Sequence, residues 1–131
     1  MNILNNIKIE GKHGKPILID LYYETTKKAK DIVIFAHGFK GFKDWGAWNL
    51  VAQKFAQAGF VFAKFNFSHN GTTPEAPLDF NDLEAFGQNN YSIESDDLNG
   101  VVSFLLETQK LINEEEINKN KIHLIGHSRG G

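Results

Sequence analysis

The chain has 131 residues, a formal net charge of −2 and no cysteine. A chain of this length buries a core of its own, and we expect residues 1–131 to form a single domain. The balanced charge provides no basic patch and argues against nucleic-acid binding. The absence of cysteine excludes disulfides and thiol catalysis and favours a cytoplasmic location. No stretch reaches the length of a membrane span, so no membrane contact is expected.

The first apolar segments predict an antiparallel hairpin. Residues 2–10 alternate weakly between apolar and polar side chains, and residues 16–23 form a denser apolar run. The polar segment Gly11–Gly14 lies between them and is typical of a hairpin turn. Three later runs, at residues 31–36, 61–65 and 121–125, are short and apolar, as expected for strands buried in a parallel sheet.

Two helices are predicted between these strands. The first has apolar residues at helical spacing from Trp48 to Phe55, with Asp44 as its expected N-cap and Gly59 as its stop signal. The second repeats that spacing from Leu98 to Leu105. Either Ser92 or Ser95 is expected to cap its start.

The order of these elements predicts the fold class. Strands and helices alternate after the hairpin, which indicates an α/β fold with a mainly parallel sheet, an antiparallel N-terminal hairpin and flanking helices. Residues 66–91 do not fit this pattern because they are polar and rich in Asn, Gly and Pro. A connection this long is expected either to contribute to a functional site or to hold a short helix around residues 82–86.

The end of the chain carries the strongest chemical signal. Gly126-His127-Ser128-Arg129-Gly130 follows a predicted strand as Gly-x-Ser-x-Gly. A serine hydroxyl is a poor nucleophile unless it is exposed and held beside a base. A sharp turn after a strand exposes it, and glycines two positions away on either side leave room for the neighbouring backbone. The alternative is a glycine-rich turn without chemistry, and the preceding strand favours the nucleophile.

A second motif follows the most apolar strand. In His37-Gly38-Phe39 the glycine lets the backbone turn, so that the Phe39 amide can point at a substrate oxygen. Together with the Arg129 amide it would form a two-donor oxyanion hole, where the loss of one donor typically costs about 2.7–4 kcal/mol of transition-state stabilisation. The alternative is that these residues simply end a strand.

The pairing of Ile34-Phe-Ala-His-Gly-Phe39 with Ile122-His-Leu-Ile-Gly-His-Ser-Arg-Gly-Gly131 resembles the α/β-hydrolase superfamily. It is most similar to the esterase, acyl-peptidase and dienelactone-hydrolase-like bacterial branches. The resemblance implies a nucleophile at Ser128, oxyanion donors at Phe39 and Arg129, and supporting roles for His37 and His127. It implies no cofactor and a small-molecule or peptide acyl substrate, taken as an ester, thioester or amide.

One departure from the family pattern affects function. The superfamily orders its triad as Ser, then Asp or Glu, then His, whereas this sequence ends three residues after Ser128. We therefore expect the N-terminal half of a hydrolase, truncated within the nucleophile elbow and inactive on its own. Two alternatives stay open: a non-catalytic fragment or binding half that needs a complementary segment, and an acyltransferase on the same scaffold.

The remaining candidates have weaker signals. His69 could lie on the substrate rim, although an ordinary surface histidine is the favoured interpretation. The Arg129 side chain is expected to be exposed, and Lys40, Lys43 and Trp45 are expected to be ordinary loop residues rather than pocket residues. No spacing of His, Asp and Glu predicts a metal site. The apolar strand Ile122–Ile125 is expected at a sheet edge, where self-association could occur.

Overall fold

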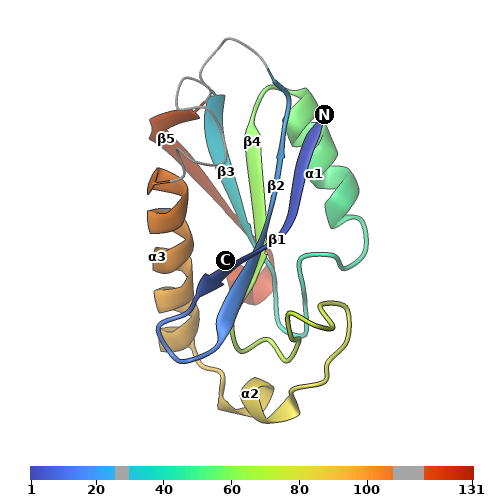
Figure 1. Ribbon diagram of the computed structural model, residues 1–131, viewed down its shortest axis with the longest axis vertical. Helices are drawn as coiled ribbons and strands as arrows, with labels where there is room; N and C mark the ends of the chain where they lie inside the picture. Colours follow the sequence, from blue (N-terminus) through green and yellow to red (C-terminus); the bar gives the residue numbers. More distant parts are fainter. Residues whose placement is uncertain (26–29, 108–116) are drawn as a thin grey trace.

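The computed structural model describes residues 1–25, 30–107 and 117–131, with the side chains of residues 117–120 outside that description. One five-stranded sheet organises the chain, in the order β1-β2-β4-β3-β5 (Figure 1). The strands are β1 (Asn2–Glu10), β2 (Pro16–Tyr23), β3 (Lys30–Ala36), β4 (Val61–Asn66) and β5 (Ile117–Gly126). The helices are α1 (Trp48–Gln57), α2 (Leu83–Gln88) and α3 (Tyr91–Glu107), and a 3-10 turn, η2 (Ser128–Gly130), follows β5.

Strand pairing makes the sheet mixed. β1 pairs with β2 and β2 with β4 in antiparallel fashion, whereas β3 pairs in parallel with both β4 and β5. The α/β class, the antiparallel N-terminal hairpin and the flanking helices are confirmed. Parallel pairing is concentrated in β4, β3 and β5, and the two strands that precede the predicted catalytic motifs, β3 and β5, are neighbours.

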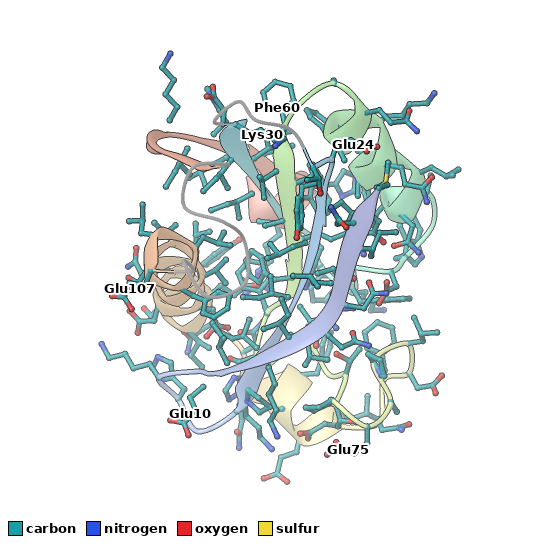
Figure 2. All side chains as sticks on the ribbon, turned by 45° about the horizontal axis from the view of Figure 1, so that its top comes forward. Glu10, Glu24, Lys30, Phe60, Glu75 and Glu107 are labelled. Atoms are coloured by element: carbon teal, nitrogen blue, oxygen red, sulfur yellow. The ribbon has the colours of Figure 1, made fainter. Side chains whose placement is uncertain are left out.

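The core has two layers, one on each face of the sheet. Successive residues of a strand point to opposite faces, so Ile32 and Ile34 pack with Val101 and Leu105 of α3, while Val33 and Phe35 pack with α1. Figure 1 shows α3 and α1 on either side of the sheet. Figure 2 shows charged side chains outside this core: the labelled residues Glu10, Glu75 and Glu107 lie at the periphery.

The starts of two helices differ from the sequence-based expectation. Asp44 does not cap α1. Its carboxylate binds the Lys43 and Lys64 ammonium groups at 2.7 and 3.2 Å, and the cap residue Ala47 supplies no side-chain hydrogen bond. Neither serine caps α3, because both lie inside the helix, and the Asn90 side chain accepts the Ile93 N–H at 2.9 Å instead. Asp44 therefore lies before the cap position, and its carboxylate forms ion pairs instead of a local cap.

The connection from residue 66 to residue 91 does hold a short helix. α2 begins after Asp82, whose carboxylate accepts the Ala85 N–H at 3.1 Å. Figure 1 shows α2 beyond the end of the sheet, on the side where β4 leads into this connection.

β5 forms one border of the sheet, next to β3. Its side chains Leu124 and Ile125 are 59% and 37% exposed, in contrast with the strands inside the sheet. The edge position expected for the segment Ile122–Ile125 is therefore present, and self-association through it stays a prediction.

Candidate active site

A strained turn lies where β5 ends. Ser128 has φ of 55°, a left-handed conformation that non-glycine residues rarely adopt, and the turn η2 starts at this residue. The His127 N–H donates to the Ala36 carbonyl at 3.0 Å, and the Gly130 N–H donates to the His127 carbonyl at 3.0 Å. The turn that carries Ser128 is thereby attached to the end of β3.

The two glycines of the motif are required by close backbone approach. A Cβ atom at Gly126 would lie 2.3 Å from the Gly130 carbonyl oxygen. A Cβ atom at Gly130 would lie 2.3 Å from the Ala36 carbonyl oxygen and 2.6 Å from that of His37. Because these distances are far below van der Waals contact, a side chain at Gly126 would force the turn itself open, and one at Gly130 would force the turn away from the end of β3.

The loop after β3 packs directly against this turn. A Cβ atom at Gly38 would lie 2.9 Å from the His127 carbonyl oxygen and 3.1 Å from the Ser128 Cβ. The backbone amides of Phe39 and Arg129 donate to no acceptor among the described residues. Two amides without an acceptor among the described residues therefore come from the two segments that meet at Ser128.

His37 is locked in a neutral form beneath this loop. Its ring is buried, its Nδ1–H donates to the Gly38 carbonyl at 2.9 Å, and its Nε2 accepts the Phe67 N–H at 3.2 Å. Burial lowers the pKa of His37 from 6.5 to about 4, although the hydrogen bond to Gly38 opposes this effect. With both ring nitrogens engaged, His37 shapes the loop and is not available as a base.

None of the histidines hydrogen-bonds the Ser128 hydroxyl within the described ranges. The ring of His127, the neighbour of the serine, packs edge-on against Trp48 at 5.2 Å between ring centroids. A base for Ser128 is therefore not provided by the described part of the chain.

His69 is not the surface histidine that the sequence suggested. It is 4% exposed, and its ring Nδ1 lies 2.8 Å from the Ser68 hydroxyl, which donates to the Asp97 carboxylate at 2.7 Å. Burial raises the pKa of Asp97 and lowers that of His69. This buried polar chain fixes the end of β4 to α3, and His69 does not line the pocket that contains Phe39 and Arg129.

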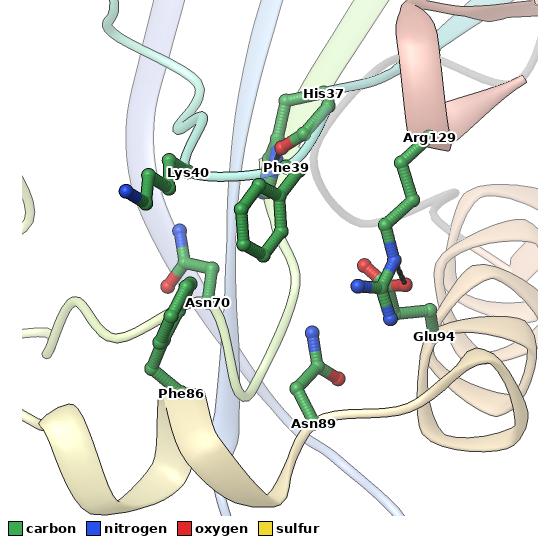
Figure 3. Close-up of a pocket in the computed structure, with 9 residues that line it drawn as sticks. His37, Phe39, Lys40, Asn70, Phe86, Asn89, Glu94 and Arg129 are labelled. Carbon is green, nitrogen blue, oxygen red and sulfur yellow. Dashed lines mark hydrogen bonds and ion pairs between the residues drawn. The ribbon is translucent and has the colours of Figure 1, made fainter.

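The Arg129 side chain is held in place rather than exposed. Its Nε donates to the Glu94 carboxylate at 2.7 Å, and its guanidinium lies 4.5 Å from the centre of the Tyr91 ring. This ion pair connects the turn after β5 to the first turn of α3, as the dashed line in Figure 3 shows. A small hollow of about 20 Å³ lies beside it, lined by His37, Gly38, Phe39, Lys40, Asn70, Phe86, Asn89, Glu94 and Arg129.

No family model and no curated protein matches the chain. Solved structures match it over nearly its whole length. Esterase Est22 gives a TM-score of 0.71 at 17% identity, over 98% of this chain and 35% of that one. The alpha/beta hydrolase GrgF from Penicillium gives 0.68 at 15% identity, over 96% and 37%. An epoxide hydrolase from Vigna radiata gives 0.63 at 18% identity, over 98% and 32%.

The chain has the α/β-hydrolase fold. It spans about a third of the length of each of these three proteins. These three proteins include one esterase and one epoxide hydrolase, so the α/β-hydrolase fold by itself does not select one reaction. The chemistry depends on the residues around Ser128.

Several residues that shape this part of the α/β-hydrolase fold escaped the sequence analysis. Asn70, Phe86, Asn89 and Glu94 line the hollow, and three of them come from the polar connection after β4. The unusual length of that connection was the available signal. Lys40 lines the hollow too, whereas Lys43 is buried and binds the Asp20 carboxylate at 3.0 Å. Neither lysine is therefore an ordinary loop residue.

No group of three or more His, Asp or Glu residues within the described ranges could hold a metal ion. None of the helices that the structure describes is both long enough and apolar enough to cross a membrane.

Proposed function

We propose that Ser128 is the nucleophile of a serine hydrolase that acts on an ester, thioester or amide. The Ser128 Oγ attacks the carbonyl carbon, and the negative charge on the carbonyl oxygen is stabilised by the Phe39 and Arg129 amides. The leaving group departs with a proton, and water then hydrolyses the acyl-serine. The histidine and acid that move these protons come from outside the residues described.

The observation that carries this proposal is the contact between the strained Ser128 turn and the Gly38 loop. A positive φ at a non-glycine residue costs free energy and persists only where the surrounding structure imposes it. Here the His127 hydrogen bond to Ala36 and the glycine contacts to β3 impose it. The result is a serine beside two unpaired amide donors, an arrangement typical of acyl-transfer sites.

The absence of a described base for Ser128 gives the proposal a second part. A serine without a hydrogen-bonded base is a weak nucleophile. The complete open reading frame is therefore expected to hydrolyse an activated ester such as p-nitrophenyl butyrate, and residues 1–131 alone are not.

The test compares variants of the complete open reading frame. Ser128→Ala should lower kcat by at least about 1,000-fold, because the acyl-enzyme cannot form. Ser95→Ala removes the hydroxyl of an exposed serine in α3 and should leave kcat unchanged. A Ser128→Ala enzyme that retains the wild-type rate would exclude the proposal, and so would full activity from residues 1–131.

A further inference from the structure

The loop that presents the Phe39 amide is a strained turn. The Gly41 N–H donates to the Gly38 carbonyl at 2.9 Å, so Phe39 and Lys40 are the two central residues of a β-turn. Lys40 has φ of 58°, a left-handed conformation that a lysine rarely adopts and that costs free energy. Such a conformation persists only where the surrounding structure imposes it. Groups that fix the end of this turn therefore also fix the direction of the Phe39 amide.

Three buried polar side chains anchor the end of this turn. Asn66, Asn70 and Thr72 are 3%, 4% and 9% exposed. The Lys43 N–H donates to the Asn66 side-chain oxygen at 2.7 Å. The Asn70 side-chain amide donates to the Gly41 carbonyl at 3.4 Å, and Figure 3 shows its nitrogen directed toward this loop. Both backbone groups at the end of the turn are thereby held by side chains from β4 and the connection that follows it.

The Thr72 hydroxyl joins the two asparagines. It donates to the Asn70 side-chain oxygen at 2.7 Å and accepts from the Asn66 side-chain amide at 3.3 Å. Each link has a fixed direction, because an amide donates through its nitrogen and accepts through its oxygen, while a hydroxyl does both. The hydrogen bonds therefore run in one series from the Lys43 N–H to the Gly41 carbonyl and close a ring over residues 41–43.

A local turn accounts for only part of this series. The Asn70 side-chain oxygen also accepts the Thr72 N–H at 3.0 Å, which is a common turn of asparagine with the residue two positions on. The hydrogen bonds to Lys43 and Gly41 instead cross to a segment 23 and 29 residues away. A buried polar network is rigid when its members are satisfied. This one fixes the loop after β3 to the connection after β4.

We propose that Thr72, together with Asn66 and Asn70, positions the Phe39 amide to stabilise the oxyanion. The three are positioning residues, because they act through the backbone of residues 41–43 and not on the reacting atoms. The inference rests on the proposed function, in which the Phe39 amide donates to the carbonyl oxygen of the substrate. A donor that can reorient stabilises the transition state less than a preorganised donor, and this loss lowers kcat rather than raising KM.

The kinetic test removes single hydroxyl groups from the complete open reading frame. Thr72→Val keeps the shape of the side chain and breaks the link between the asparagines. It should lower kcat for p-nitrophenyl butyrate about 10-fold and leave KM within about two-fold of the wild-type value. Thr72→Ser restores the hydroxyl and should retain at least about half of the wild-type kcat. Thr73→Val is the matched control, since it removes a hydroxyl that accepts the Ala76 N–H at 3.1 Å within its own turn, and its kcat should stay unchanged.

Hydrogen exchange tests the same network without catalysis. The Gly41 amide is hydrogen-bonded within the turn and the Lys43 amide to Asn66, so both report whether the loop is held. Thr72→Val should exchange these two amides at least about 10-fold faster than wild type does. Thr72→Ser and Thr73→Val should exchange them at the wild-type rate.

Four results would overturn the inference. They are unchanged exchange in Thr72→Val, faster exchange with an unchanged kcat, failure of Thr72→Ser to restore kcat, and an equal loss of kcat in Thr73→Val. An inactive wild-type enzyme would contradict the proposed function, whereas the exchange rates would still decide whether the Thr72 hydroxyl holds the loop.

Discussion

β3 and β5 are adjacent parallel strands that end at the same place and differ in the exposure of their side chains. Ile34 on β3 is 1% exposed, while its register partner Leu124 on β5 is 59% exposed. The next pair repeats the contrast, with Phe35 at 2% and Ile125 at 37%. Both strands lead into glycine-containing turns, and these two turns meet at Ser128.

The two segments that form the candidate site are therefore packed to different extents. β3 lies between β4 and β5 and is covered by both helical layers, so the loop at Gly38 has a rigid base. β5 is a border strand, and its turn is held by the Ala36 hydrogen bond and by close glycine contacts to β3. The geometry of Ser128 therefore depends on the contacts that its turn makes with the end of β3.

The largest expected difference in unfolding free energy is between alanine substitutions of the two register partners Ile34 and Leu124. Ile34→Ala should lower the free energy of unfolding by about 2–5 kcal/mol, because it leaves a cavity in the core. Leu124→Ala removes a similar number of atoms from an exposed site and should change it by less than about 0.5 kcal/mol. Urea unfolding of the two variants measures the contrast. Equal losses would mean that β5 is as well packed as β3.

A smaller loss of unfolding free energy is expected from a substitution where the turn after β5 contacts the end of β3. Gly130→Ala places a Cβ atom 2.3 Å from the Ala36 carbonyl oxygen and should cost about 1–3 kcal/mol of unfolding free energy. Gly87→Ala in α2 is the matched control, since a Cβ atom there meets nothing within 4 Å. Its stability should stay level or rise slightly. If Gly130→Ala were as stable as wild type, the turn would not be held against β3.

The smallest expected effect is the pH dependence that His37, the residue after β3, gives to the free energy of unfolding. Its folded pKa of about 4 lies below the ordinary value of 6.5, so its contribution to stability is complete above pH 6.5 and declines as the pH falls toward 4. Between pH 7.5 and 5.5 this decline amounts to about 1.4 kcal/mol.

The measurement is urea unfolding of wild type and His37→Gln at both pH values. The drop in unfolding free energy should be about 1.4 kcal/mol smaller in the variant. Because Asp97 and His69 are present in both proteins, their titration cancels in the comparison. An identical drop in wild type and His37→Gln would contradict the buried neutral state of His37.

The sequence was sufficient for those features of the fold that depend on local pattern. The apolar runs predicted the strands, the helical spacing around Trp48 and Leu98 predicted α1 and α3, and the position of the Gly-x-Ser-x-Gly motif after a strand placed Ser128 at a turn. Each of these signals lies within a few consecutive residues, where backbone geometry and side-chain periodicity act directly.

The features that were missed depend on partners far apart in the chain. The Asp44 carboxylate binds Lys64 and does not cap α1, and the buried His69 is linked to Asp97 of α3 through the Ser68 hydroxyl. Glu94 could not be paired with Arg129 from spacing, since 35 residues separate them. The hollow near Asn89 likewise needs three segments brought together by the sheet.

The most direct test of the central claim is chemical labelling of the serine nucleophile. The complete open reading frame is treated with a fluorophosphonate, and the modified peptide is identified by mass spectrometry, with Ser128→Ala and Ser95→Ala treated in parallel. We expect a single modification on Ser128, present in Ser95→Ala and absent from Ser128→Ala. Labelling at another residue, or undiminished labelling of Ser128→Ala, would contradict the assignment of Ser128 as the nucleophile.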